Sequence, residues 1–253
     1  MGSYLNPGST LFRGSLRSKI YVDKSGFIEK TNDLICTEQK YVCVSRPRRF
    51  GKSMAANMLA AYYKRDEDTR ALFDKLMISQ AQSYKEHLNQ YDVIRINMQQ
   101  FLSETHSMEE MLSKICNYLI QDLQEAYEQI RFREKTSLVQ TMKDVFANTG
   151  HPFVILIDEW DCLFREYQQD KDAQKKYLDF LRVWLKDQDY VGLAYMTGIL
   201  PIKKYGSHSA LNMFIEYSMT DPGDMAQYFG FTEEEVGELC QEYDMSFEET
   251  KAW

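Results

Sequence analysis

The chain has 253 residues, of which 44% are hydrophobic and 27% are charged, and only 5 are proline. A chain of this length and composition can bury a sizeable core, which excludes a disordered or low-complexity protein. Its net charge of −8 argues against a protein that coats nucleic acid along its whole surface.

The positive charge is concentrated at the N-terminal end. Residues 1–65 carry 12 Lys and Arg against 4 Asp and Glu, whereas residues 66–253 carry 18 against 34. A basic end of this kind suits a polyanionic ligand such as a nucleotide, although a solvated basic surface with no ligand would have the same composition.

The sequence predicts neither a signal peptide nor a membrane span. The first residues lack an apolar stretch, and the most apolar runs, 153–157 and 191–200, are too short to cross a bilayer. The five cysteines are widely spaced without a C-x-x-C pair, so they indicate neither a zinc site nor a disulfide framework. We expect a cytoplasmic protein with reduced cysteines and no membrane partner.

Short β-branched runs alternate with helical periodicity from about residue 40 onward, the pattern of βαβ units around a parallel sheet. We therefore expect an α/β fold whose five-stranded, mainly parallel sheet is flanked by helices. The predicted strands span residues 41–45, 93–98, 153–158, 191–197 and 213–219. The predicted helices span residues 53–64, 68–77, 107–130, 137–148 and 172–186.

The first predicted strand leads into a basic loop and then a helix. A loop ending in Gly-Lys-Ser in this position is typical of a phosphate-binding P-loop, whose backbone N–H groups surround phosphate oxygens. Lys52 would place a positive charge near the β and γ phosphates, and Ser53 would ligate Mg²⁺ through its hydroxyl. The predicted nucleotide-binding residues are Arg46, Pro47, Arg48, Arg49, Phe50, Gly51, Lys52, Ser53 and Met54.

Arg46 stands where the common P-loop motif has its first glycine, so the formal pattern is incomplete. A side chain at that position blocks the tight turn unless the loop follows another path. Pro47 fixes its own φ and biases Arg46 toward an extended conformation. We therefore expect a stiffer loop than a glycine-rich one.

The strand predicted at 153–158 is wholly apolar until it ends in Asp158, and Glu159 follows directly. Strands of this kind are buried on both faces and deliver their last residues to the sheet edge where ligands of α/β proteins bind. Asp158 would hold Mg²⁺ through water, and Glu159 would polarise the attacking water. This is the pattern of a Walker B strand.

The loop contains three arginines, at positions 46, 48 and 49, which repel one another around a single phosphate group. We expect at least one of them to pair with an acid of the Walker B region, at 158, 159 or 161, when nucleotide is absent. ATP would then compete for that arginine and free the acids for Mg²⁺. Asp161 is assigned as a structural partner of the arginine-rich loop rather than a metal ligand.

The strand predicted at 191–197 ends in Thr197. P-loop ATPases with an additional strand carry a sensor of the γ phosphate at this place, which makes Thr197 a candidate catalytic residue beside Lys52 and Glu159. A hydrogen bond at the strand end without catalytic importance fits Thr197 equally well.

After the turn signal at 221–223 the chain changes to short acidic helices. Capping boxes begin at Thr232 and Ser246, as one does at Ser107. The helix after Ser246 has too few residues before Trp253 to be stable alone, so the sequence looks cut off. We expect an α/β domain over residues 1–220, with 1–38 packing on it, and the start of a truncated, lid-like helical subdomain over 221–253.

Six segments carry a family resemblance: Tyr4-Leu5-Asn6-Pro7-Gly8, Tyr21-Val22-Asp23-Lys24-Ser25, Arg46-Pro47-Arg48-Arg49-Phe50-Gly51-Lys52-Ser53, Ile157-Asp158-Glu159-Trp160-Asp161, Thr197-Gly198-Ile199 and Phe229-Gly230-Phe231-Thr232-Glu233-Glu234-Glu235. Together they are similar to the bacterial AAA-ATPase-like family, in which a P-loop ATPase domain is usually followed by a PD-(D/E)xK nuclease-like domain. The resemblance covers nearly the whole chain, and its loop motif is highly specific.

The resemblance implies an additional-strand AAA-like fold that binds ATP with Mg²⁺, hydrolyses it and couples hydrolysis to a C-terminal partner domain. It also implies that the loop with Arg46 is the family's ordinary phosphate loop. The family continues past the equivalent of Trp253, so a nuclease-like domain would be missing here. Self-association is a further expectation, and nucleic acid as a partner stays open.

Three functions remain open. The first is an ATPase. The second is a nucleotide-binding regulatory switch with slow or no hydrolysis, because no arginine follows Arg182 and the catalytic charge would have to come from the loop, from Lys203 or Lys204, from another subunit or from a missing portion. The third is a nucleic-acid-associated module based on the basic N-terminal third, for which no helix-turn-helix or zinc-finger pattern is found.

Overall fold

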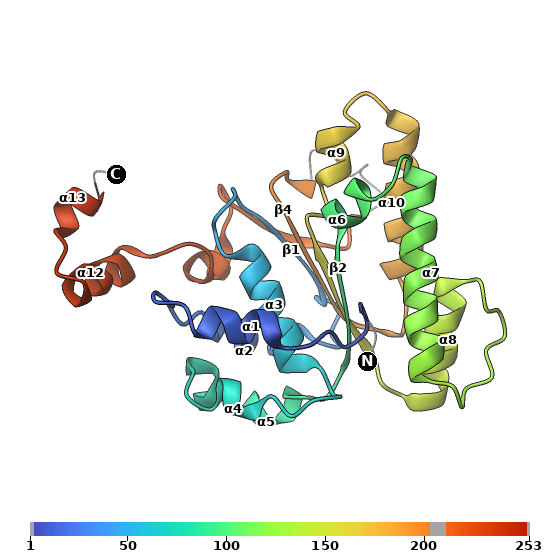
Figure 1. Ribbon diagram of the computed structural model, residues 1–253, viewed down its shortest axis with the longest axis horizontal. Helices are drawn as coiled ribbons and strands as arrows, with labels where there is room; N and C mark the ends of the chain where they lie inside the picture. Colours follow the sequence, from blue (N-terminus) through green and yellow to red (C-terminus); the bar gives the residue numbers. More distant parts are fainter. Residues whose placement is uncertain (1–2, 203–210, 252–253) are drawn as a thin grey trace.

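A computed structural model describes residues 3–202 and 211–251 of the chain. Its centre is a sheet with the strand order β2-β3-β4-β1-β5, in which all neighbouring strands pair in parallel (Figure 1). The five predicted strands are confirmed, and the additional strand β4 lies between β1 and β3. Their bounds are β1 Tyr41–Ser45, β2 Asp92–Asn97, β3 Phe153–Asp158, β4 Val191–Gly198 and β5 Ile215–Ser218.

Helices cover both faces of the sheet (Figure 1). One face packs against α1 Thr10–Leu16, α2 Gly26–Leu34, α3 Lys52–Tyr63, α4 Arg70–Phe73, the 3-10 helix η1 Met77–Gln80 and α5 Tyr84–His87. The other face packs against α6 Met98–Ser103, α7 Met108–Ala126, α8 Leu138–Thr149, α9 Cys162–Glu166 and α10 Lys171–Leu185. The chain then continues through η2 Gly223–Tyr228, α12 Glu233–Glu242 and α13 Phe247–Lys251.

The strands contribute to two hydrophobic cores, one on each face of the sheet. In β1, Val42 and Val44 belong to the core under α3, whereas Tyr41 and Cys43 belong to the core under α7 and α10. Every residue of β1, β3 and β4 is buried. Because both faces are covered, these strands are continuous apolar runs, which is why they were predictable from sequence.

The prediction of a helix over residues 68–77 is wrong for most of that range. Only Arg70–Phe73 is α-helical, and Leu76 is extended, with φ −95° and ψ 162°. The amide of Met77 donates to the Asp23 carboxylate at 2.7 Å, and the next amide donates to the Ser25 hydroxyl at 3.1 Å. These tertiary hydrogen bonds replace the intrahelical bonds that would continue the helix.

The helix predicted to reach Ile130 ends earlier, at Ala126. Beyond it the chain turns, and the amide of Ile130 donates to the carbonyl of Tyr127 at 2.9 Å. Ile130 is still buried in the core below α7. The apolar spacing therefore predicted burial correctly but extended the helix into a turn.

The predicted capping boxes form to different extents. The Ser107 hydroxyl accepts from the Glu110 amide at 3.1 Å, but the Glu110 carboxylate accepts from His106 and not from Ser107 itself. At α12 both halves of the box are present between Thr232 and Glu235. The helix starts were therefore predicted correctly, while the reciprocal bond at Ser107 was not.

The N-terminal segment covers the outer edge of the sheet. Leu5 forms an antiparallel bridge with Ile94 of the edge strand β2, and the amide of Arg95 donates to the carbonyl of Tyr4 at 2.9 Å. The Asp122 carboxylate on α7 accepts from the amides of Tyr4 and Leu5 at 2.8 and 3.1 Å. Covering an edge strand in this way blocks pairing with other chains.

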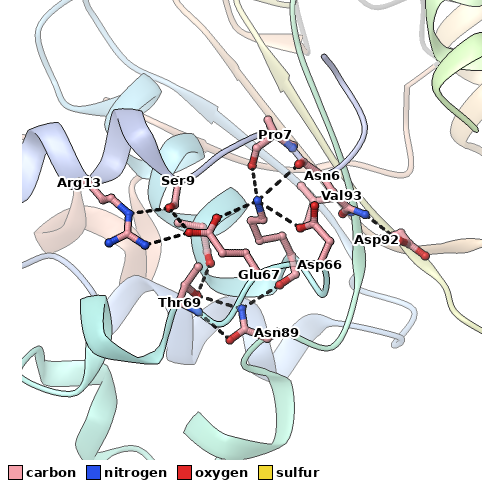
Figure 2. Close-up of polar contacts among 12 residues, drawn as sticks. Asn6, Pro7, Ser9, Arg13, Asp66, Glu67, Thr69, Asn89, Asp92 and Val93 are labelled. Atoms are coloured by element: carbon pink, nitrogen blue, oxygen red, sulfur yellow. Dashed lines mark hydrogen bonds and ion pairs between the residues drawn. The ribbon is translucent and has the colours of Figure 1, made fainter. Parts of the chain in front are cut away.

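Lys64 directly follows α3 and is fully buried. Its ammonium donates to the carbonyl of Pro7 at 2.9 Å and lies 3.1 Å from carboxylate oxygens of both Asp66 and Glu67. Glu67 also accepts from Arg13 of α1 (Figure 2). Burial raises the pKa of Glu67, but the hydrogen bonds from Arg13 and Lys64 outweigh it and lower this pKa to about 2. The cluster ties the N-terminal segment to the end of α3.

Lys64→Ala should lower the free energy of unfolding by about 3–5 kcal/mol, because it leaves the partners of a buried cation without it. Urea unfolding followed by circular dichroism would measure the change. Lys75→Ala is the matched control, since Lys75 is exposed and a surface substitution should cost at most about 0.5 kcal/mol. A loss below about 1 kcal/mol for Lys64→Ala would mean that the cluster contributes no more than a surface ion pair.

The described residues also bear on membrane spans and on the state of the cysteines. No helix within residues 3–202 and 211–251 is long and apolar enough to cross a membrane. All five cysteines are unpaired, and Cys43, Cys162 and Cys240 are buried. Burial raises the pKa of Cys162 to about 12, so this thiol stays protonated at neutral pH.

Candidate nucleotide-binding site

The loop between β1 and α3 ends in a helix start that is free to bind an anion. Gly51 is the N-cap of α3 with φ +77°, a conformation that favours glycine, and no side chain of the described residues caps this helix start. The first backbone N–H groups of a helix have no partner within the helix. With the positive end of the helix dipole, they make a site for phosphate oxygens.

Lys52 is buried and bends back onto its own loop. Its ammonium donates to the carbonyls of Arg46 and Pro47 at 2.9 and 2.8 Å. Burial lowers the pKa of Lys52, and the nearby carboxylates of Glu159 and Asp158 oppose that shift. The lysine of the loop and the two acids after β3 therefore act on one another electrostatically, as a single site requires.

Arg46 occupies the position of the missing glycine without closing the loop. Its side chain is buried, its guanidinium donates to the carbonyl of Tyr217 in β5 at 3.3 Å, and its amide donates to the carbonyl of Gly198 at 3.1 Å. Burial lowers the pKa of Arg46. The side chain is thus turned toward the sheet edge, which explains how a loop without the first glycine keeps its turn. Arg48 and Arg49 are exposed.

Asp158 and Thr197 meet at the carboxyl ends of β3 and β4. The Thr197 hydroxyl donates to one oxygen of the Asp158 carboxylate and accepts from the amide of Glu159 at 3.4 Å. The second oxygen of Asp158 is buried and has no hydrogen-bond partner among the described residues. A buried carboxylate oxygen of this kind is an available ligand for a cation or for metal-bound water.

The turn after β3 is fixed to the end of β4. The Asp161 carboxylate accepts from the amides of Ile199 and Leu200 at 3.0 and 2.8 Å. A Cβ on Gly198 would lie only 2.6 Å from the Trp160 ring nitrogen and 2.9 Å from the Asp161 carboxylate, so only glycine fits there. Asp161 therefore supports the backbone at the end of β4, and the assignment of Asp161 as partner of the arginine-rich loop is wrong.

Glu159 is paired with an arginine that lies outside the loop. Arg165, on α9, donates to the Glu159 carboxylate, and its Nε lies 3.6 Å from the Asp161 carboxylate. Among the described residues, no ion pair joins an arginine of the loop to these acids. The expected pairing of an acid with Arg46, Arg48 or Arg49 is thus wrong. Arg165 of α9 supplies the positive charge beside Glu159, whereas the loop arginines are turned to β5 or to solvent.

An apolar hollow of about 140 Å³ adjoins the loop. Phe50 and Met54 line it from the loop side, Phe12 and Tyr21 from the N-terminal segment, and Phe231 from the chain ahead of α12. Aromatic and aliphatic walls beside a phosphate-binding helix start are suited to a flat, apolar group attached to phosphate.

The chain ahead of α12 touches the phosphate loop directly. The amide of Gly230 donates to the carbonyl of Phe50 at 3.2 Å, and a Cβ on Gly230 would lie 3.0 Å from the Phe50 ring. Lys24 pairs with Glu235 at the start of α12. The C-terminal helices, which extend away from the body of the molecule in Figure 1, are thus anchored beside the loop and the hollow.

Comparisons with known proteins agree with this geometry. A family model described as "Predicted AAA-ATPase" matches residues 14–207, most of the chain. The chain belongs to this AAA-ATPase family. It is also 25% identical over 221 residues to an uncharacterized protein from the vnfD 5' region of Azotobacter chroococcum mcd 1, a match that covers 85% of this chain and 40% of the relative. The chain therefore spans well under half of that relative's length.

The fold is similar to that of the Aeropyrum pernix ORC1 protein, solved in complex with DNA. The TM-score is 0.50 at 11% identity, and the match covers 95% of this chain and 54% of the ORC1 chain. With the strand order, this confirms the predicted P-loop fold of the additional-strand AAA-like type.

The motifs at 46–53, 157–161 and 197–199 lie together at the carboxyl ends of β1, β3 and β4, but one participant was missed. Arg165 follows Asp161 by four residues, which places both on one side of α9. Since an i, i+4 acid and arginine pair is common on any helix surface, the spacing alone gave no reason to assign it to the site. Lys203 and Lys204, named as alternative cations, lie outside the described residues.

Proposed function

We propose that this AAA-ATPase chain binds ATP together with Mg²⁺ and hydrolyses it. The observation that carries the proposal is that, within the described residues, the uncapped start of α3 and the unpartnered buried oxygen of Asp158 follow the carboxyl ends of parallel strands of one sheet. In this assignment the N–H groups of the loop and of α3 surround the β and γ phosphates. Lys52 would exchange its two loop carbonyls for phosphate oxygens.

Ser53 and Asp158 are the residues that would hold Mg²⁺. Ser53 is exposed at the start of α3, and Asp158 offers its unpartnered carboxylate oxygen. The described residues contain no group of three or more His, Cys, Asp or Glu side chains able to bind a metal. Mg²⁺ commonly needs only one or two protein ligands, because waters and substrate phosphates complete its coordination. When bound, it offsets negative charge on the phosphate oxygens.

Glu159 is the proposed general base. It would accept a proton from water as the water oxygen bonds to the γ phosphorus and the bond from that phosphorus to the β–γ bridging oxygen breaks, which releases ADP. Thr197 would position this group, since its hydroxyl bonds both Asp158 and the amide of Glu159. The hollow beside Phe50 would take the base of the nucleotide.

We further propose that nucleotide binding is coupled to the C-terminal helices. Gly230 bonds the loop at Phe50 and Lys24 bonds α12 at Glu235, so a change in the loop would reach the chain that follows. In longer relatives the C-terminal helices would lead to a partner domain. The family resemblance implies that this domain is nuclease-like. Self-association and nucleic acid remain further candidate partners, and a cytoplasmic location remains a proposal.

A nucleotide-binding switch with slow turnover is the second candidate function. The Arg165 contact favours it, because this contact occupies the carboxylate that should activate water. Phosphate release measured under single-turnover conditions separates the two candidates. A half-life of hours for bound ATP would favour the switch, and a half-life of seconds would favour the ATPase.

Calorimetric titration with ATP tests the proposed function itself. ATP should bind in the presence of Mg²⁺, and its affinity should be lower by about tenfold or more in EDTA, since the cation would bridge phosphates and protein. Asp158→Asn should remove most of that difference, because an amide is a much weaker Mg²⁺ ligand than a carboxylate. No binding of ATP to the folded wild-type chain would overturn the proposal.

A further inference from the structure

Arg165 forms an ion pair with Glu159, the proposed base. Its guanidinium donates to the Glu159 carboxylate and lies 3.4 Å from the side-chain oxygen of Gln99, at the start of α6. The Arg165 and Glu159 side chains are only 18% and 22% exposed. An ion pair with this little exposure is screened less than one on the open surface.

The contact is not needed to support the neighbouring turn. Asp161 already accepts two backbone amides of the β4 end, and the Nε group of Arg165, although close to Asp161, makes no hydrogen bond within the described part of the chain. The guanidinium is therefore directed mainly at Glu159.

The backbone of Glu159 is held independently of Arg165. Glu159 has φ +57°, an uncommon conformation for a residue with a side chain, and its amide and the next one bond the Thr197 hydroxyl and carbonyl. A change in the position of the carboxylate therefore requires rotation of the Glu159 side chain rather than movement of the turn. Arg165 is the group that opposes this rotation.

We propose that Arg165 is a positioning residue that restrains the Glu159 carboxylate in the nucleotide-free site and must release it before hydrolysis. This inference rests on the proposed function. The restraint is geometric, because the guanidinium fixes the direction of the carboxylate. ATP brings negative charge beside Lys52 and so offers Arg165 an alternative partner. Turnover is thereby kept low for as long as Arg165 stays paired with Glu159.

Arg165→Gln should raise kcat by about threefold to tenfold, the factor expected for loss of one partly buried ion pair. The dissociation constant for Mg·ATP should stay within about twofold, because the restraint concerns the base and not the phosphates. Arg165→Lys keeps the positive charge, so its kcat should remain close to that of the wild type. Arg182→Gln is the matched control, since Arg182 pairs with Asp179 on the exposed surface of α10.

Single-turnover and steady-state phosphate release, with calorimetry for affinity, provide the readouts. In a Glu159→Gln background the Arg165→Gln change should have no effect on turnover, as required if Arg165 acts through Glu159. A kcat that falls or is unchanged in Arg165→Gln, while wild type hydrolyses ATP, would overturn this inference alone. ATP binding without turnover in every variant would overturn both this inference and the hydrolysis proposed above.

Discussion

Lys52→Ala should weaken ATP binding by a factor of about one hundred or more, because it removes the buried cation assigned to the β and γ phosphates. The replacement should leave the fold intact. In the nucleotide-free structure Lys52 bonds only to carbonyls of its own loop, at Arg46 and Pro47, and these can be hydrated when the ammonium is gone. Calorimetric titration with Mg·ATP would measure the loss.

Lys143→Ala serves as the control for this experiment. Lys143 is exposed on α8, on the opposite face of the sheet from α3, and its replacement should change neither affinity nor stability. Equal affinity of Lys52→Ala and wild type for ATP would remove the P-loop assignment. Circular dichroism of both variants would show whether any loss of binding arises from unfolding instead.

The parts of the fold that sequence predicted best are those that depend on local pattern. The run Phe153–Asp158 could be assigned as a strand because a strand buried on both faces must be continuously apolar. Asp158 and the Glu159 that follows it could be placed at the ligand-binding edge because parallel strands end at a common edge. The strand order, by contrast, required the three-dimensional structure.

Contacts between distant residues account for what was missed. The extended conformation at Leu76 depends on Asp23, more than fifty residues earlier, and the buried state of Lys64 depends on Pro7. Propensity and spacing contain no information on such pairs. The direction of Arg46 likewise depends on a carbonyl of β5, far along the chain, which the loop sequence alone cannot indicate.

The most informative error concerns the charges of the site. Repulsion among the loop arginines led us to expect that one of them pairs with Asp158, Glu159 or Asp161, and no ion pair of the described residues does so. The structure supplies a positive charge from α9, through Arg165, because the helix begins directly after the acids and returns its arginine to them. The partner of Glu159 depends on the path of the turn at Trp160, whose amide donates to the Thr197 carbonyl, and the loop sequence contains no information on that path.

Glu159→Gln should reduce turnover by about one hundredfold to ten thousandfold, the usual contribution of a general base. Mg·ATP should remain bound, because the amide keeps the shape of the side chain while Lys52, Ser53 and Asp158 are unchanged. Phosphate release and calorimetry on the same preparation would show the separation of binding from hydrolysis. Glu166→Gln, an exposed change on α9, is the control and should leave both unaffected.

The alternative base in this region is Asp161, and the structure argues against it. Asp161 is fully buried, and one of its carboxylate oxygens accepts the amides of both Ile199 and Leu200, so this side chain holds the end of β4. Asp161→Asn should therefore lower stability as well as activity, whereas Glu159→Gln should affect activity alone. Hydrolysis at the wild-type rate by Glu159→Gln would show that Glu159 is not the base. The Arg165 contact would then be an ion pair that only stabilises α9.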